Sequence, residues 1–84
     1  MADCWHVYIV RCADGTLYTG VARDLAKRLG QHNGERAGGP RYTRGRRPVA
    51  LAWSVAAADR SVAQRREAAI KKLSRSEKQR LIDS

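Results

Sequence analysis

Two short runs rich in β-branched and aromatic residues, separated by a turn, constrain the fold of this chain most strongly. Residues 5–12 read Trp-His-Val-Tyr-Ile-Val-Arg-Cys, residues 16–22 read Thr-Leu-Tyr-Thr-Gly-Val-Ala, and Ala13-Asp14-Gly15 lies between them. Such runs on either side of an Asp-Gly turn predict a β-hairpin. A chain of 84 residues can hold only one hydrophobic core, so the hairpin has to pack against all the other elements.

The length of the turn leaves two registers open, which differ in the side chains that share a face. A two-residue Asp14-Gly15 turn puts Tyr8 and Tyr18 on opposite faces, and composition favours this turn. A three-residue loop with glycine in the left-handed conformation pairs Tyr8 with Gly20 and puts both tyrosines on one face. The residues alone do not choose between the two registers.

A helix and a basic loop are predicted after the hairpin. Asp24 is a suitable cap for a helix that runs to about Asn33, with Leu25 and Leu29 on its buried side. Residues 34–48 contain four glycines, two prolines and five arginines against one acidic residue. This composition is typical of a mobile basic loop.

One further strand and two helices complete the chain. The apolar run 49–57 predicts a strand, although its alanines also suit a helix. Residues 61–73 predict a helix whose inward residues are Val62, Ala69, Ile70 and Leu73. Ser74 and Glu77 form a capping box that begins a last helix, which continues through Ile82. The order ββαβαα describes one α/β domain over residues 1–84.

The charge of the chain indicates a polyanionic partner. Lys and Arg total 17 against 8 acidic residues, which gives a net charge of +9, and most of these cations are arginines. The planar guanidinium of arginine binds phosphate at two points. A basic loop beside a basic helical region, residues 60–80, therefore suits a nucleic-acid backbone. The alternative is a solvated surface that keeps the protein soluble.

Several classes of protein do not match the sequence. No run approaches the roughly 18 apolar residues of a membrane helix. The first residues lack the features of a signal peptide, so we expect a cytoplasmic protein with Cys4 and Cys12 as free thiols. No P-loop, dinucleotide-binding glycine pattern or Gly-x-Ser-x-Gly motif is present. Together with His6 and His32, the cysteines lack the spacing of zinc ligands.

Glu67 is the most informative acidic residue. It lies among Arg65, Arg66, Lys71 and Lys72, at the border of the apolar side of its predicted helix. A single carboxylate is enough to hold Mg²⁺ when water and substrate phosphate oxygens supply the other ligands. The alternative is an ion pair with Lys71 four residues on, which the spacing by itself favours.

The ordered set of these residues resembles the GIY-YIG endonuclease superfamily. The first tripeptide of the family corresponds to His6-Val7-Tyr8, and the second to Tyr18-Thr19-Gly20. The residues that follow in the family's order are Arg28, His32 and Glu67. Residues 42–48 and 65–74 look like the small, stand-alone bacterial members of YhbQ type. The resemblance covers nearly the whole chain.

Membership of this superfamily would imply a fold and a reaction. The implied fold is α/β, with a three-stranded antiparallel sheet flanked by three helices and both tyrosines facing one active site. The resemblance therefore selects the three-residue Ala13-Asp14-Gly15 loop. The implied reaction is hydrolysis of a DNA phosphodiester bond with one Mg²⁺ or Mn²⁺ ion. RNA stays open as a substrate, because phosphate contacts carry little information about the sugar.

The resemblance also implies roles for individual residues. Tyr8 and Tyr18 would bind and activate the attacking water, with Tyr8 favoured as the general base. Arg28 would stabilise charge on the scissile phosphate, and His32 would orient a tyrosine or assist proton transfer. Glu67 would hold the divalent cation, which also receives the leaving 3′-oxygen. Because a free tyrosine has a pKa near 10, the site would have to lower the pKa of its tyrosine base.

The chain departs from the family's pattern at several positions. Gly and Ile of the first tripeptide are His6 and Val7 here, and Ile of the second is Thr19. We expect these positions to tolerate the change because they pair through their backbone. Val21 stands where several members have Lys, and Gln79 is a weak counterpart of their Asn near the end of the domain.

Substrate recognition would have to rest on this domain. The predicted nucleic-acid ligands are Arg41, Arg44, Arg46, Arg47, Lys71 and Lys72. We expect structure-selective or loosely specific cutting of DNA by a monomer or weak dimer, with targeting by a protein partner as a further option. The alternatives are a catalytically weak or inactive module that binds nucleic acid, and a basic protein-interaction domain.

Overall fold

The computed structural model describes residues 4–84 and confirms the predicted architecture. The elements are β1 (Trp5–Arg11), β2 (Leu17–Ala22), α1 (Leu25–His32), α2 (Arg41–Arg44), β3 (Ala50–Ala57), α3 (Arg60–Lys71) and α4 (Arg75–Asp83). The three strands form one antiparallel sheet in the order β2-β1-β3. The short helix α2, inside the predicted loop, is the one addition to the order ββαβαα.

The strands β1 and β2 are joined by the three-residue loop and not by the two-residue turn that composition favoured. The Gly15 N–H donates to the Cys12 carbonyl at 2.9 Å, and Gly15 has a φ of 85°. This left-handed conformation favours glycine. Tyr8 pairs with Gly20 in the ladder, so Tyr8 and Tyr18 share a face of the sheet.

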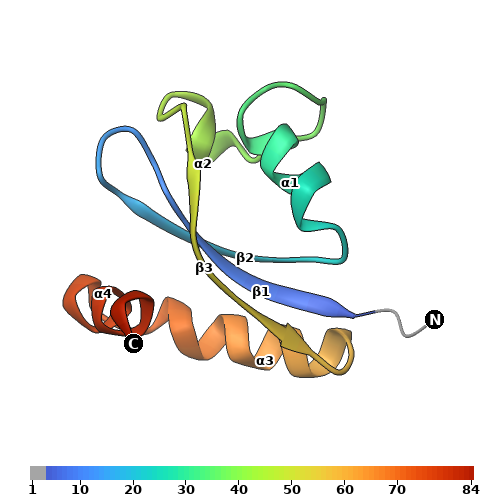
Figure 1. The fold of residues 1–84 in the computed structure, drawn as a ribbon, viewed down its shortest axis with the longest axis vertical. Coiled ribbons are helices and arrows are strands. Elements are labelled where there is room, and N and C mark those ends of the chain that lie inside the picture. Colours follow the sequence, from blue (N-terminus) through green and yellow to red (C-terminus); the bar gives the residue numbers. More distant parts are fainter. Residues whose placement is uncertain (1–3) are drawn as a thin grey trace.

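Helices cover both faces of the sheet, with α1 and α2 on one side and α3 and α4 on the other (Figure 1). Successive side chains of a strand point to opposite faces, so β1 contributes to two apolar layers. The layer toward α3 is built from Val7, Ile9, Ala57, Ala63 and Ile70. The layer toward α1 is built from Tyr8, Val10, Cys12, Ala22 and Val49.

Side-chain caps begin the three longer helices. Asp24, Asp59 and Ser74 each accept a hydrogen bond from the backbone N–H three residues further on, and the capping box of Ser74 is complete. Helix α3 buries Ala63 fully, whereas Ala69 is exposed. The predicted inward position of Ala69 is therefore wrong, because the buried side of α3 follows Ala63 and Ile70, seven residues apart.

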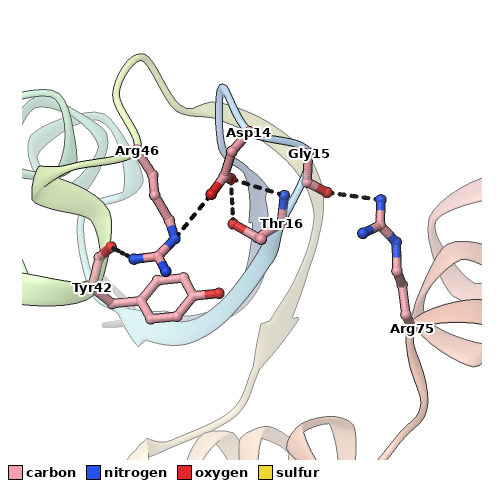
Figure 2. Close-up of polar contacts among 6 residues, drawn as sticks. All are labelled: Asp14, Gly15, Thr16, Tyr42, Arg46 and Arg75. Carbon is pink, nitrogen blue, oxygen red and sulfur yellow. Dashed lines mark hydrogen bonds and ion pairs between the residues drawn. The ribbon is translucent and has the colours of Figure 1, made fainter.

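The loop at the tip of the hairpin contacts both the segment after α2 and the helix α4. Arg46 Nε lies 3.1 Å from Asp14 Oδ2, and the Arg46 guanidinium carbon lies 4.2 Å from the centroid of the Tyr42 ring (Figure 2). On the other side of the loop, Arg75 of α4 donates to the Gly15 carbonyl at 2.9 Å. The loop that fixes the register of the hairpin is thus held from both sides.

Thr19 stands where the family pattern has isoleucine. Its side chain is buried, and its position pairs with Ile9 on the face toward α3. Thr19 Oγ1 has no hydrogen-bond partner within residues 4–84. An unpaired buried hydroxyl costs about 1–3 kcal/mol.

The two cysteines do not meet in the fold. Cys4 is an exposed free thiol and Cys12 a buried one, as the sequence predicted. Within residues 4–84, no helix has both the length and the apolar character needed to cross a membrane.

Candidate active site

Tyr8, on the central strand β1, supplies the hydroxyl around which the site is arranged. Its side chain is 1% exposed, and its ring lies across Gly20 of strand β2. A Cβ atom at position 20 would lie 2.5 Å from the Tyr8 hydroxyl oxygen and 2.7 Å from its Cζ. The glycine of the second tripeptide therefore allows the phenol ring to lie over the edge strand.

His32, the last residue of α1, contacts this hydroxyl and lies in a chain of buried polar groups. The Tyr8 hydroxyl oxygen is 2.8 Å from His32 Nε2, and His32 Nδ1 is 3.0 Å from Thr43 Oγ1. The Thr43 hydroxyl donates to the Pro40 carbonyl at 3.2 Å. Both His32 and Thr43 are 0% exposed. The hydrogen bond between these two residues is therefore shielded from bulk water.

The Pro40 carbonyl gives this chain of hydrogen bonds a direction. A carbonyl only accepts, so it takes the hydroxyl proton of Thr43. Thr43 Oγ1 then accepts the proton on His32 Nδ1, which leaves Nε2 as the acceptor for the Tyr8 hydroxyl. The contacts thus assign the tautomer of His32. Sequence reasoning gave no role to Thr43, since no local pattern connects a threonine with a histidine eleven positions earlier.

The imidazole of His32 is neutral at pH 7. Burial, followed by the positive charges of Arg28 and Arg47, lowers the pKa of His32 from 6.5 to about 4. Arg47 is also held against this residue, because its Nε donates to the His32 backbone carbonyl at 2.7 Å. A neutral His32 matches the acceptor role of Nε2.

Arg28 lies beside the Tyr8 hydroxyl and is fixed by two further contacts. Its Nε donates to the Tyr8 hydroxyl oxygen over 3.4 Å. Its Nη1 donates to Gln31 Oε1 at 2.8 Å and to the Gly38 carbonyl at 3.2 Å. The guanidinium is therefore positioned by α1 and by the loop that follows it.

The pKa of Tyr8 is raised from its ordinary value of 10, not lowered as the resemblance required. Burial is the largest cause, and it outweighs the hydrogen bond and the positive charge of Arg28, which both lower the pKa. The charges of Tyr18 and Glu67 raise it further. At pH 7 Tyr8 is therefore a neutral phenol that donates to His32.

Tyr18 connects the buried part of the site to the surface. Its ring centroid lies 5.3 Å from that of His32, with the rings at 67°, and 5.5 Å from that of Tyr42. Tyr42, on α2, is 40% exposed. The three rings form a continuous aromatic wall beside Tyr8.

Glu67 lies on α3, which packs on the other side of the sheet (Figure 1). It follows Ala63 by four residues and precedes Ile70 by three, so it shares their side of the helix. Its side chain is 23% exposed, and Lys71 Nζ lies 3.5 Å from Glu67 Oε2, which is the ion pair that the spacing favoured. Glu67 also lies within electrostatic range of the Tyr8 hydroxyl, because its charge contributes to the raised pKa of Tyr8.

A divalent cation at this site would have one protein carboxylate. Residues 4–84 contain no group of three or more His, Cys, Asp or Glu side chains that could hold a metal ion. Mg²⁺ accepts a site with one or two carboxylates when water and phosphate oxygens complete its six ligands. Glu67 fits this requirement, and Lys71 would compete with the cation for its Oε2.

The structure does not gather the predicted nucleic-acid ligands on one surface. Arg41 and Arg44 are exposed on α2, while the guanidinium of Arg46 is engaged with Asp14 and Tyr42. Lys71 and Lys72 lie at the end of α3, on the other side of the sheet (Figure 1). The basic residues near the site therefore form two separate groups, and their binding role stays a prediction.

The fold and the clustered side chains define a small α/β domain with a tyrosine, histidine and arginine site on one face of its sheet. A family model described as the GIY-YIG catalytic domain matches residues 4–80. The chain belongs to this GIY-YIG family of nuclease domains.

Similar proteins carry the name UPF0213. The chain is 54% identical over 78 residues to a UPF0213 protein of Desulfotalea psychrophila, covering 93% of this chain and 70% of that protein. It is 46% identical over 77 residues to one of Halobacterium salinarum, covering 92% and 97%. The solution NMR structure of a UPF0213 protein from Bacillus halodurans has a TM-score of 0.60 and 36% identity, covering 95% of this chain and 83% of that one.

Proposed function

We propose that this protein is a metal-dependent endonuclease that hydrolyses DNA phosphodiester bonds. The observation that carries the proposal is the direct contact of Arg28 and His32 with the Tyr8 hydroxyl. These are residues to which the family resemblance assigns catalytic roles, and Tyr18 shares the face of the sheet on which Tyr8 lies. Hydrolysis of a phosphodiester needs a base for the attacking water and positive charge near the phosphate. Tyr8 with His32 would supply the base, and Arg28 would supply the charge.

In this proposal Tyr8 and His32 act together as the base. The Tyr8 hydroxyl passes its proton to His32 Nε2, and the phenolate oxygen then takes a proton from the attacking water. The imidazolium that forms keeps its proton on Nδ1, and this N–H donates to Thr43 Oγ1, 3.0 Å from Nδ1. Arg28 favours the phenolate and offers positive charge to the scissile phosphate, and Tyr18 helps to orient the water.

Glu67 would hold one Mg²⁺ or Mn²⁺ ion. The ion would supply positive charge where negative charge develops on the leaving 3′-oxygen. We further propose a structure-selective or loosely specific reaction in the cytoplasm, by a monomer or weak dimer. DNA is the primary substrate of the proposal, and RNA is the other nucleic acid to test.

A second candidate is a nucleic-acid-binding module of low turnover. Two observations favour it: burial raises the pKa of Tyr8, and Lys71 already pairs with Glu67, the carboxylate proposed to hold the metal. Both features would slow hydrolysis without weakening the attraction of a domain with a net charge of +9 for phosphate.

A cleavage assay separates the two candidates. Purified protein with Mg²⁺ or Mn²⁺ is incubated with labelled single-stranded, duplex, flap and branched DNA, beside the variants Glu67→Gln and Glu35→Gln. Glu35 is an exposed acid of the loop after α1 and serves as the charge-matched control. We expect Glu67→Gln to lose at least about 100-fold in cleavage rate, while Glu35→Gln cleaves normally and both bind DNA in EDTA.

Two outcomes would contradict the proposal. Cleavage by Glu67→Gln at the wild-type rate would remove Glu67 from the reaction. Binding of DNA by the folded wild-type protein, with no cleavage of any of the four substrates, would favour the binding module.

A further inference from the structure

A hollow of about 360 Å³ adjoins the proposed active site at the end of the sheet where β1 begins. Its lining includes Trp5, Val21, Arg23, Lys27, Arg28 and Gln31. We refer to it as the Trp5 hollow. None of Trp5, Arg23 and Lys27 belongs to the residues that the sequence predicted for catalysis or for nucleic-acid binding.

The Trp5 hollow shares one side chain, Arg28, with the proposed active site. Arg28 lines it, and the Nε atom of the same residue is 3.4 Å from the Tyr8 hydroxyl oxygen. Gln31 also lines it and accepts a hydrogen bond from Arg28 Nη1 at 2.8 Å. A molecule bound here would therefore touch the side chain proposed to contact the scissile phosphate.

The charge of the hollow is positive. Arg23, Lys27 and Arg28 contribute three cations, against one carboxylate from Asp24. That carboxylate is already used as the cap of α1, where it accepts a hydrogen bond from the Lys27 backbone N–H at 3.1 Å. The side chain of Lys27 is exposed, and Lys27 lies three residues after the cap of the helix that carries Arg28. The hollow thus suits a phosphate group.

An aromatic ring forms one side of the hollow. The Trp5 ring is half-buried against the apolar layer under α3, which holds it in place. The guanidinium carbons of Arg23 and Arg60 lie over this ring, 5.7 Å and 5.9 Å from its centroid, so a base that stacks on Trp5 takes the place of one of them. A fixed aromatic ring beside cations is the combination with which proteins bind single-stranded nucleic acid, because a base stacks on the ring while the cations contact the backbone.

We infer that the Trp5 hollow binds one nucleotide of the substrate strand, next to the phosphate that is cleaved. Lys27 contacts the phosphate of this nucleotide, and its base lies against Trp5. The volume lies near the lower end of the 300–1,000 Å³ typical of ligand sites, which suits a single nucleotide. The inference rests on the proposed function and deepens it.

This subsite would explain how a domain of this size selects its substrate. A base inside a duplex is stacked on its neighbours and does not reach Trp5. A base in a single-stranded segment is free to stack on an aromatic ring, whatever its sequence. The Trp5 hollow therefore predicts cutting beside unpaired nucleotides, with little dependence on sequence.

Tryptophan fluorescence in EDTA tests the inference without any cleavage. The chain has two tryptophans, so Trp53→Phe leaves Trp5 as the one indole fluorophore. Titration of this variant with oligo(dT) should give saturable quenching. Adding Lys27→Gln should weaken the apparent affinity by about 5- to 10-fold at low salt, because one phosphate contact is lost.

Two controls accompany the titration. Lys78→Gln makes the same charge change on α4, at the other end of the sheet (Figure 1), and should alter the affinity less than 2-fold. The variant Trp5→Phe, with Trp53 kept, should bind oligo(dT) with little change in fluorescence. This second variant keeps an aromatic ring at position 5 and retains Trp53. It therefore tests whether Trp5 is the quenched fluorophore even if Trp53→Phe does not fold.

The outcomes separate this inference from the proposed function. Absent quenching, in a protein whose Mg²⁺-dependent cleavage needs Glu67, would overturn the Trp5 hollow and leave the nuclease intact. An equal loss of affinity in Lys78→Gln and Lys27→Gln would overturn it as well, since the effect would then be one of net charge. Quenching that depends on Lys27, in a protein that cleaves nothing, would support the subsite and reject the nuclease.

Discussion

Among single residues, Thr43 decides what His32 can do. The two side chains are fully buried and 3.0 Å apart, and the Pro40 carbonyl fixes the direction of the hydrogen bonds between them. A histidine whose Nδ1 carries the proton presents Nε2 as an acceptor to Tyr8. With the other tautomer, Nε2 would carry the proton and donate to the Tyr8 oxygen, so it could not accept the Tyr8 proton. The proposed proton transfer therefore needs Thr43 although this residue does not touch the substrate.

We predict that Thr43→Val lowers the free energy of unfolding by about 1–3 kcal/mol, because His32 Nδ1 loses its buried acceptor. The ¹⁵N chemical shifts of His32 at pH 7 provide a second measurement. They should show a protonated Nδ1 and an unprotonated Nε2 in the wild type and in Thr43→Ser, but not in Thr43→Val. A protonated Nε2 in the wild type would contradict the tautomer assignment.

Within the hairpin, the register and one glycine position the catalytic tyrosine. The left-handed Gly15 closes a three-residue loop, which sets Tyr8 opposite Gly20. Because Gly20 has no side chain, the Tyr8 ring crosses the edge strand and its hydroxyl comes within the electrostatic influence of Glu67. The hairpin therefore supplies two strands to the sheet and also positions the Tyr8 hydroxyl.

We predict that Gly20→Ala destabilises the protein by about 1–3 kcal/mol, because the added methyl group would overlap the Tyr8 ring. The ¹⁵N signal of His32 Nε2 should shift as the hydrogen bond from Tyr8 is disturbed. Gly45→Ala is the matched control, since an added Cβ at position 45 has no neighbour within 4 Å among residues 4–84, and it should change stability by less than about 0.5 kcal/mol. Equal effects of the two variants in chemical denaturation would refute the packing role of Gly20.

For the whole molecule, the buried His32 links stability to pH. Its pKa is about 4 in the folded protein and near 6.5 in the unfolded chain. Between these values the unfolded chain binds more protons, so this contribution to stability is present above about pH 6.5 and is lost as the pH falls toward 4. The lowered pKa values of Asp14 and Glu77 act in the same direction, but mainly below pH 5.

We predict that the free energy of unfolding falls by about 2 kcal/mol between pH 7 and pH 5. Urea denaturation at a series of pH values in this range measures the effect while most carboxylates stay ionised. The variant His32→Gln should show a clearly smaller dependence on pH, whatever its stability at pH 7. The same slope in wild type and variant would show that His32 does not carry this dependence.

The sequence by itself determined the order and type of the main elements, because the signals for these are local. The caps at Asp24, Asp59 and Ser74 all lie within three residues of the backbone groups that they bind. The residues left the hairpin register open between two loop lengths, and the family resemblance selected the one that the structure has. The family motif also placed Tyr8, Arg28 and His32 in one site.

The tertiary structure alone decided the chemistry of those residues. The raised pKa of Tyr8 follows from desolvation, which no local pattern records. The contact of Thr43 with His32 and the place of Trp5 beside Arg28 depend on segments that meet only when the chain is folded. The separation of the basic residues between two sides of the sheet has the same origin, because burial and long-range contacts belong to the packed molecule.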